Sequence, residues 1–157
     1  MHTLIGVLVE ADSIAEAISH AEEFATRLVG DDGFGDYYHV LRGGPERSNG
    51  PFPLGTPEAE KWLKKLVSQT RAELKDAAET VLSYAGGKPE HLLAALNSDD
   101  GAFLRGALYD LGYGPTSATH LHGEHEIDVR GIQGKAMLTR ELAKNKYTHL
   151  VLVDVHY

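Results

Sequence analysis

Cysteine and long apolar runs are both missing from this chain. Its 157 residues include no cysteine, which excludes a disulfide framework, thiolate metal sites and a cysteine nucleophile. No stretch approaches the about 20 apolar residues that a membrane-spanning helix requires. The apolar run Leu4–Val9 is short and lacks the basic start of a secretory signal. We therefore expect a cytoplasmic protein without a membrane partner.

Positive charge is also scarce. Lysine and arginine total 15 against 23 aspartates and glutamates, so the formal net charge at pH 7 is −8. Binding along a nucleic-acid backbone depends on a basic face that releases counterions from the phosphates. The charge balance therefore argues against extended nucleic-acid binding, although it leaves room for a small basic pocket.

The order of the elements that the sequence predicts indicates an α+β fold. β-branched apolar runs predict strands, and apolar residues at helical spacing behind a capping residue predict helices. The predicted strands cover residues 3–9, 36–41, 118–129 and 148–156, and the predicted helices cover residues 13–30, 56–86, 89–96, 98–111 and 134–144.

With residues 56–112 set aside as a helical insertion, the remaining order is that of a ferredoxin-like split βαβ–βαβ sheet of about four strands. In that layout the second and third predicted strands pair antiparallel. One feature disagrees, because Leu150–Val155 would form an edge strand although it is more apolar than residues 118–129. The length is typical of one domain, and we treat residues 1–157 as such.

A glycine- and proline-rich loop over residues 42–55 is the first candidate site. Its glycines allow close backbone approach to a ligand, and its arginines supply cationic donors. Antiparallel pairing of the second and third strands would bring this loop beside the start of strand 118–129, and the end of strand 3–9 points to the same edge. The candidate ligand-binding residues are Arg42, Arg47, Tyr38, His39, His120, His122 and Glu10.

This grouping favours a non-enzymatic binding protein. The arginines would neutralise a small anionic ligand, of which a nucleotide is one example, while the tyrosines and histidines would stack or donate hydrogen bonds. A protein partner at the same edge is the other form of the hypothesis.

A second hypothesis rests on three imidazoles and one carboxylate in the string His120-Leu121-His122-Gly123-Glu124-His125. Such a set can bind zinc or another divalent metal, the one cofactor that the sequence suggests. A metal-dependent hydrolase would use His120, His122 and His125 as ligands and Glu124 as the general base.

Strand alternation gives a simpler interpretation of the same string. In a regular strand His120, His122 and Glu124 would share a solvent-facing side, and His125 would point to the other. Only a bulge or turn at Gly123 would bring the three histidines together.

A third hypothesis is a structural or assembly subunit. The first and last predicted strands are apolar on both faces, so both faces of the sheet need cover. The helical insertion would cover the second face, or a second copy of the chain would do so in a homodimer.

Overall fold

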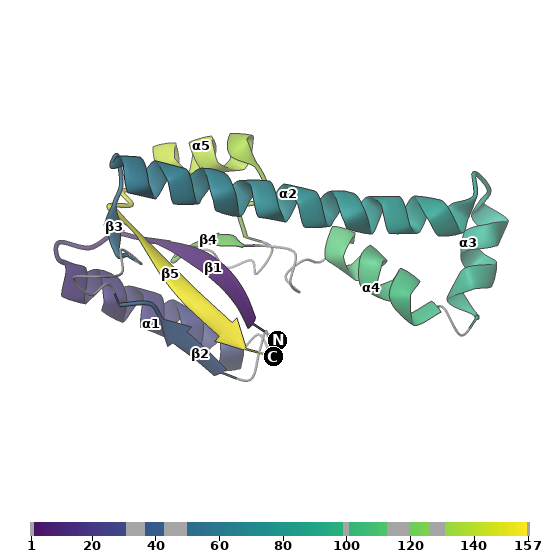
Figure 1. Cartoon of the computed structure of the whole chain (residues 1–157), viewed down its shortest axis with the longest axis horizontal. Coiled ribbons are helices and arrows are strands. Elements are labelled where there is room, and N and C mark those ends of the chain that lie inside the picture. Colours follow the sequence, from purple (N-terminus) through teal and green to yellow (C-terminus); the bar gives the residue numbers. More distant parts are fainter. Residues whose placement is uncertain are drawn as a thin grey trace.

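The structure is a computed structural model that describes residues 2–30, 37–42, 50–98, 101–112, 120–125 and 131–156. These residues form a five-stranded mixed sheet and five helices (Figure 1). The α+β class expected from the sequence is therefore confirmed.

The sheet is built around a long antiparallel ladder between β1 (His2–Val9) and β5 (His149–His156). On the far side of β1, β4 (Leu121–Gly123) runs parallel to it. On the far side of β5, β2 (Tyr37–Val40) and β3 (Phe52–Pro53) both pair antiparallel with it. The strand order is β2-β5-β1-β4, with β3 beside β5.

The expected ferredoxin-like strand order is not confirmed. β1 does lie between β4 and β5, as that order requires. However, β2 pairs with β5 at one edge of the sheet, whereas β4 lies at the other edge, so the expected pairing of the second and third strands is wrong. The physical reason is the composition of β5: Leu150–Val153 and Val155 are fully buried, and a strand that is apolar on both faces needs neighbours on both sides.

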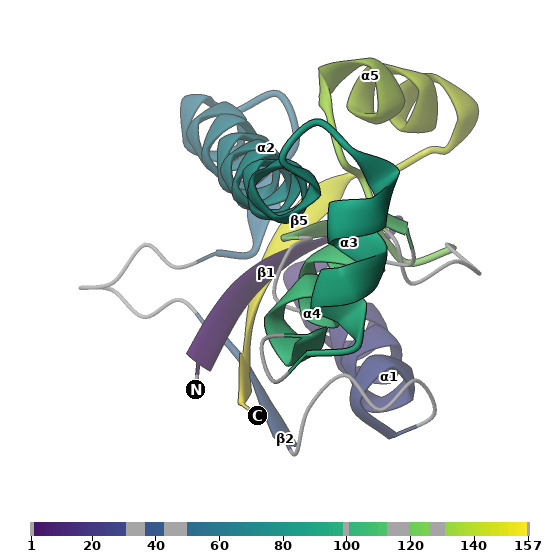
Figure 2. The same ribbon diagram turned by 90° about the vertical axis from the view of Figure 1, so that its right-hand side faces the viewer.

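Helices cover both faces of the sheet, as Figure 2 shows. The 17-residue helix α1 (Ile14–Gly30) buries its small and apolar side chains against one face, where alternate valines of β1 and β5 lie. On the opposite face, α2 (Pro57–Ala85) packs over the leucines of the same two strands, with α5 (Lys135–Lys144) beside it. The helical insertion thus covers the second face, one of the two arrangements that the sequence allowed.

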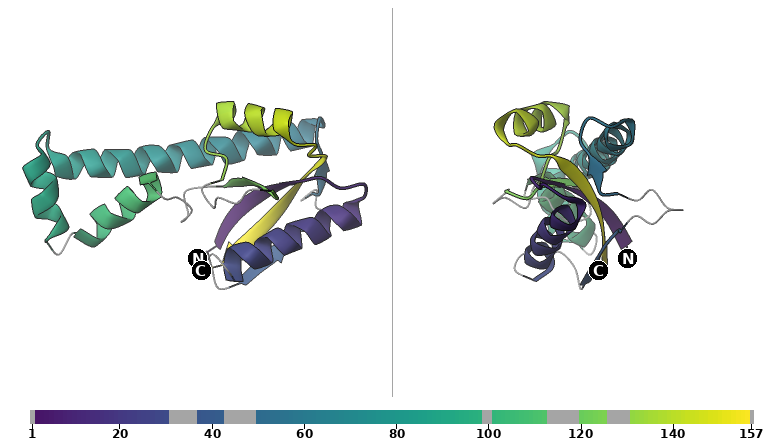
Figure 3. Two further views of the ribbon diagram at one scale, coloured as in Figure 1. Left: turned by 180° about the vertical axis from the view of Figure 1, so that it is seen from behind. Right: turned by 90° about the vertical axis from the view of Figure 1, so that its left-hand side faces the viewer.

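The insertion also extends well beyond the sheet. Thr56 caps the start of α2, because its side chain accepts a hydrogen bond from the backbone N–H of Ala59. The 29 residues of α2 span about 44 Å at about 1.5 Å per residue. Its second half leaves the sheet and packs against α3 (Pro89–Leu96) and α4 (Gly101–Gly112). We call the second half of α2 with α3 and α4 the helical arm (Figure 3). None of the helices described is long and apolar enough to cross a membrane.

Gly6 sets how closely α2 approaches the sheet. A Cβ atom at this position would lie 2.5 Å from Leu66 Cδ1 of α2 and 2.9 Å from Leu150 Cδ1 of β5. Both leucines are fully buried, so neither side chain has space to move away. A glycine in this central strand therefore serves helix-to-sheet packing.

We expect Gly6→Ala to lower the free energy of unfolding by about 1–3 kcal/mol, because the added methyl overpacks the core. Urea denaturation measures the change. Gly30→Ala is the matched control, since nothing lies within 4 Å of a Cβ atom at the end of α1. Equal stability of the two variants would contradict the close packing at Gly6.

Candidate functional site

The structure does not assemble the ligand-binding edge expected from the sequence. Arg42 follows β2 at one edge of the sheet and its Nη2 lies 2.5 Å from Glu22 Oε1 of α1, whereas His120 and His122 belong to the opposite edge. Tyr38 is also turned to α1, with its hydroxyl 2.8 Å from that of Thr26. The grouping of Arg42 with the two histidines is therefore wrong.

Two further residues of that group take no part in such an edge. His39 lies opposite Asp154 in the antiparallel ladder between β2 and β5. Arg47 lies outside the described residues, as do the other residues from 43 to 49.

His120 and His122 are buried, and their surroundings differ. His120 Nδ1 lies 3.0 Å from the carbonyl oxygen of Leu4, its Nε2 lies 2.7 Å from Glu73 Oε1 of α2, and its backbone N–H donates to Thr70 Oγ1 over 3.0 Å. His122 is fully buried beside Phe24 of α1, with 5.4 Å between ring centroids. The expectation of solvent-facing histidines is therefore wrong for both.

The metal-ligand set expected from the sequence is likewise not gathered. His120 contacts α2 and His122 contacts α1, while only Glu124 and His125 contact each other. Throughout the ranges that the structure describes, no group of three or more histidine or carboxylate side chains is placed to hold a metal ion. The geometry gives the metal-dependent hydrolase hypothesis no support.

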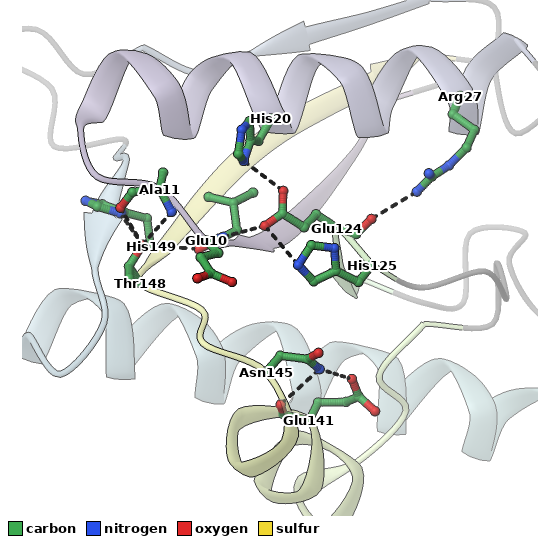
Figure 4. A network of polar contacts seen from close by, with 11 residues as sticks. Glu10, Ala11, His20, Arg27, Glu124, His125, Glu141, Asn145, Thr148 and His149 are labelled. Carbon is green, nitrogen blue, oxygen red and sulfur yellow. Dashed lines mark hydrogen bonds and ion pairs between the residues drawn. The ribbon is translucent and has the colours of Figure 1, made fainter.

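What the structure does gather is a polar group around Glu124 (Figure 4). The Glu124 side chain is only 10 % exposed. Its Oε1 accepts a hydrogen bond from the backbone N–H of Glu10 and lies 3.6 Å from His125 Nε2. Its Oε2 lies 2.9 Å from Nδ1 of His20, on α1. One nearly buried carboxylate therefore lies between two imidazoles.

The parallel pairing of β1 and β4 explains why these residues meet. Glu10 follows the last residue of β1, and Glu124 follows the last residue of β4. Because parallel strands end at the same edge of a sheet, the two glutamates become neighbours, and this edge is where ligands bind in many α/β proteins. The backbone N–H of Glu124 extends the ladder by donating to the carbonyl oxygen of Leu8 over 2.9 Å.

Neighbouring residues fix this edge. Thr148 Oγ1 accepts a hydrogen bond of 2.9 Å from the backbone N–H of Ala11 and so holds the turn after β1. The ring of Tyr147 stacks on that of His125, with 5.9 Å between centroids and 19° between planes. Gly123 permits this stacking, since a Cβ atom there would collide with the Tyr147 hydroxyl.

Glu10, Glu124 and His125 were predicted from the sequence for other roles, whereas His20 was not among the predicted residues. The sequence nevertheless contains a weak signal for His20. His20 and Arg27 are seven residues apart, which places them on the same face of α1. Arg27 Nη2 indeed donates to the backbone oxygen of Glu124 over 3.2 Å. A hollow of about 450 Å³ adjoins Arg27 and is lined also by Glu23, Thr26 and Gly30.

The chemistry of this group is that of one carboxylate between two imidazoles. The Nδ1 of His20 and the Nε2 of His125 face the Glu124 carboxylate, so His20 Nε2 and His125 Nδ1 lie on the far side of each ring. A ring that directs its N–H at the carboxylate keeps a lone pair on that far nitrogen. The side chains of His20 and His125 are partly exposed, whereas the Glu124 carboxylate between them is nearly buried.

Comparison of the chain with known proteins returned no match, either among protein-family models or among curated proteins and solved structures.

His120 supplies a test of the buried part of this region. We expect Glu73→Ala to lower the free energy of unfolding by about 1–3 kcal/mol, because His120 Nε2 would lose its acceptor inside the fold. Glu79→Ala is the control on the same helix: that carboxylate forms only an exposed pair with Lys75 at 3.3 Å, and its loss should change stability by about 0.5 kcal/mol or less. Urea denaturation compares the two variants, and equal losses would argue against the His120 contact.

Proposed function

We propose that the protein is a binding protein for a small organic cation, an amine or a guanidinium compound, at the edge where β1 and β4 end. The single observation that carries this proposal is the nearly buried carboxylate of Glu124 between the imidazoles of His20 and His125.

Hydrogen-bond polarity favours a donor as the ligand. In the proposed site each ring directs its N–H at Glu124, so the outward nitrogens of His20 and His125 accept hydrogen bonds from the ligand. A protonated amine or a guanidinium carries several N–H donors and no acceptor, which is the complementary pattern.

Charge favours a cation over the anion that the sequence suggested. Among the described residues, the exposed side chains of Glu10 and Asp12 follow β1, and Glu124 adds a third carboxylate, while Arg27 contributes a guanidinium. The argument for an anion relied on Arg42, whose guanidinium is paired with Glu22 and lies at the other edge of the sheet. An acidic edge attracts a cation and repels phosphate or carboxylate ligands.

Thermal shift and calorimetry test this proposal with named probes. We expect spermidine and agmatine to raise the melting temperature, since ligands that bind only the folded state stabilise it, whereas inorganic phosphate should not. Glu10→Gln should weaken amine binding by about three- to fivefold, as expected from the loss of one partly exposed ion pair. Glu90→Gln, which removes an exposed carboxylate on α3, is the matched control. Stabilisation by phosphate but not by the amines would refute the proposal.

A further inference from the structure

A groove lies between α2 and α5, on the face of the sheet opposite α1. The two helices run side by side over that face (Figures 1 and 2). None of the residues of α5 is buried, so this helix covers the face incompletely. The groove has a volume of about 510 Å³, within the range of about 300–1,000 Å³ that is typical of small-molecule sites. Five of its lining residues come from α2 and two from α5.

The floor of the groove is aliphatic and continues the core. Leu63 is buried in the cluster that α2 forms with the leucines of β1 and β5, and Val67 and Leu138 pack against that cluster while they remain partly exposed. Among the described residues that line the groove, none is aromatic. The floor therefore suits a flexible hydrocarbon chain better than a flat ring, which gains from an aromatic stacking partner.

Two lysines, one from each helix, lie at the rim of the groove. Lys64 belongs to α2 and Lys135 is the first residue of α5, and both residues are exposed. In the part of the chain that the structure describes, neither ammonium group has an ion-pair partner. A lysine can lay its methylene stem along an aliphatic surface while its charge stays in water. The two lysines thus leave the floor apolar and place positive charge above it.

The charge of the described lining fits a ligand with one negative charge. Lys64 and Lys135 contribute two positive charges and Glu60 one negative charge, so the sum is +1 (2 − 1). Glu60 lies one turn before Lys64 and Ser68 one turn after it, so the acidic residue and the neutral hydroxyl donor mark opposite ends of the groove. A carboxylate carries one charge, whereas a phosphate monoester carries about 1.5 to 2 at pH 7.

We propose that the groove between α2 and α5 binds an aliphatic carboxylate, such as a fatty acid. The hydrocarbon chain lies on Leu63, Val67 and Leu138, and the carboxylate lies between the two lysines at the Ser68 end, away from Glu60. This site is on the other face of the sheet from α1, which supplies the imidazole of His20 to the amine site. The two proposals are therefore independent.

The two parts of such a ligand contribute differently. Burial of the chain supplies most of the affinity, because each buried CH2 group is favourable and the floor offers no competing polar atom. Ion pairs at an exposed rim add little to affinity, since water and salt screen them. The lysines therefore act mainly in selecting the sign of the charge and the direction in which the ligand lies.

Calorimetry on the full chain with named probes tests both parts. We expect octanoate and decanoate to bind, and decanoate to bind about threefold to tenfold more tightly because it buries two more CH2 groups. Acetate, which has no chain, should not bind. Octan-1-ol, which has the chain without the charge, should bind about fivefold to tenfold more weakly than octanoate, as expected from the loss of two exposed ion pairs.

Charge variants test the orientation of the ligand. Lys64→Gln and Lys135→Gln should each weaken decanoate binding by about three- to fivefold. Glu60→Gln should strengthen it by about twofold, because a like charge is removed from the groove. Lys75→Gln is the matched control: it removes an exposed lysine of the same helix about 16 Å along the axis from Lys64, beyond the screening length at physiological salt. Opposite signs at residues 60 and 64 are not expected from a general loss of stability.

A cysteine substitution locates the ligand, because the natural chain has no cysteine. Decanoate should slow the reaction of the thiol in Ser68→Cys with a maleimide, whereas the thiol in Lys75→Cys should react at the same rate with and without decanoate. A thiol at residue 68 that decanoate does not protect would contradict the proposed position.

Three further outcomes would overturn the proposal. The first is the absence of any binding of octanoate and decanoate. The second is an unchanged decanoate affinity when Lys64→Gln and Lys135→Gln are combined. The third is binding of octyl phosphate more than tenfold tighter than that of octanoate, which would assign the groove to a phosphate monoester. None of these outcomes bears on amine binding at Glu124.

Discussion

The antiparallel ladder between β1 and β5 is the constraint on which the rest of the structure depends. All eight residues of each strand pair, and the side chains of both strands are apolar on both faces along most of their length. A pair of strands with two apolar faces requires a helix layer on each side and neighbouring strands at each edge. α1 and α2 supply the layers, β2 and β3 pair with β5, and β4 pairs with β1.

The candidate site follows from that arrangement. With β5 beside β1 on one side, the other side of β1 accepts β4 in parallel, and the ends of the two strands meet. Glu10 and Glu124 become neighbours at this edge, and α1 passes close enough for His20 and Arg27 to reach Glu124. The nearly buried carboxylate of Glu124 lies between the imidazoles of His20 and His125, and in a weakly polar environment such contacts are stronger than they would be in water.

The helical arm follows from a different feature, the length of α2. The sheet is only wide enough to cover the first half of this helix, in which Leu63 and Leu66 are buried. The second half carries α3 and α4 away from the sheet, where the three helices have only one another to pack against. A three-helix arm of this size leaves apolar side chains on its outer faces, among them Leu82, Leu93 and Phe103.

The sequence by itself determined the α+β class, the approximate bounds of α1, α2, α3 and α4, and the need to cover both faces of the sheet, because periodicity, caps and strand composition are local properties. Only the tertiary structure decided that β2 pairs with β5 and not with β4, and this single choice separated Arg42 from His120 and His122. It also decided that His120 is buried against α2 and His122 against α1, and that His20, which belongs to no local motif, contacts Glu124. Strand pairing and helix docking are contacts between segments far apart in the chain, and no pattern within either segment specifies its partner.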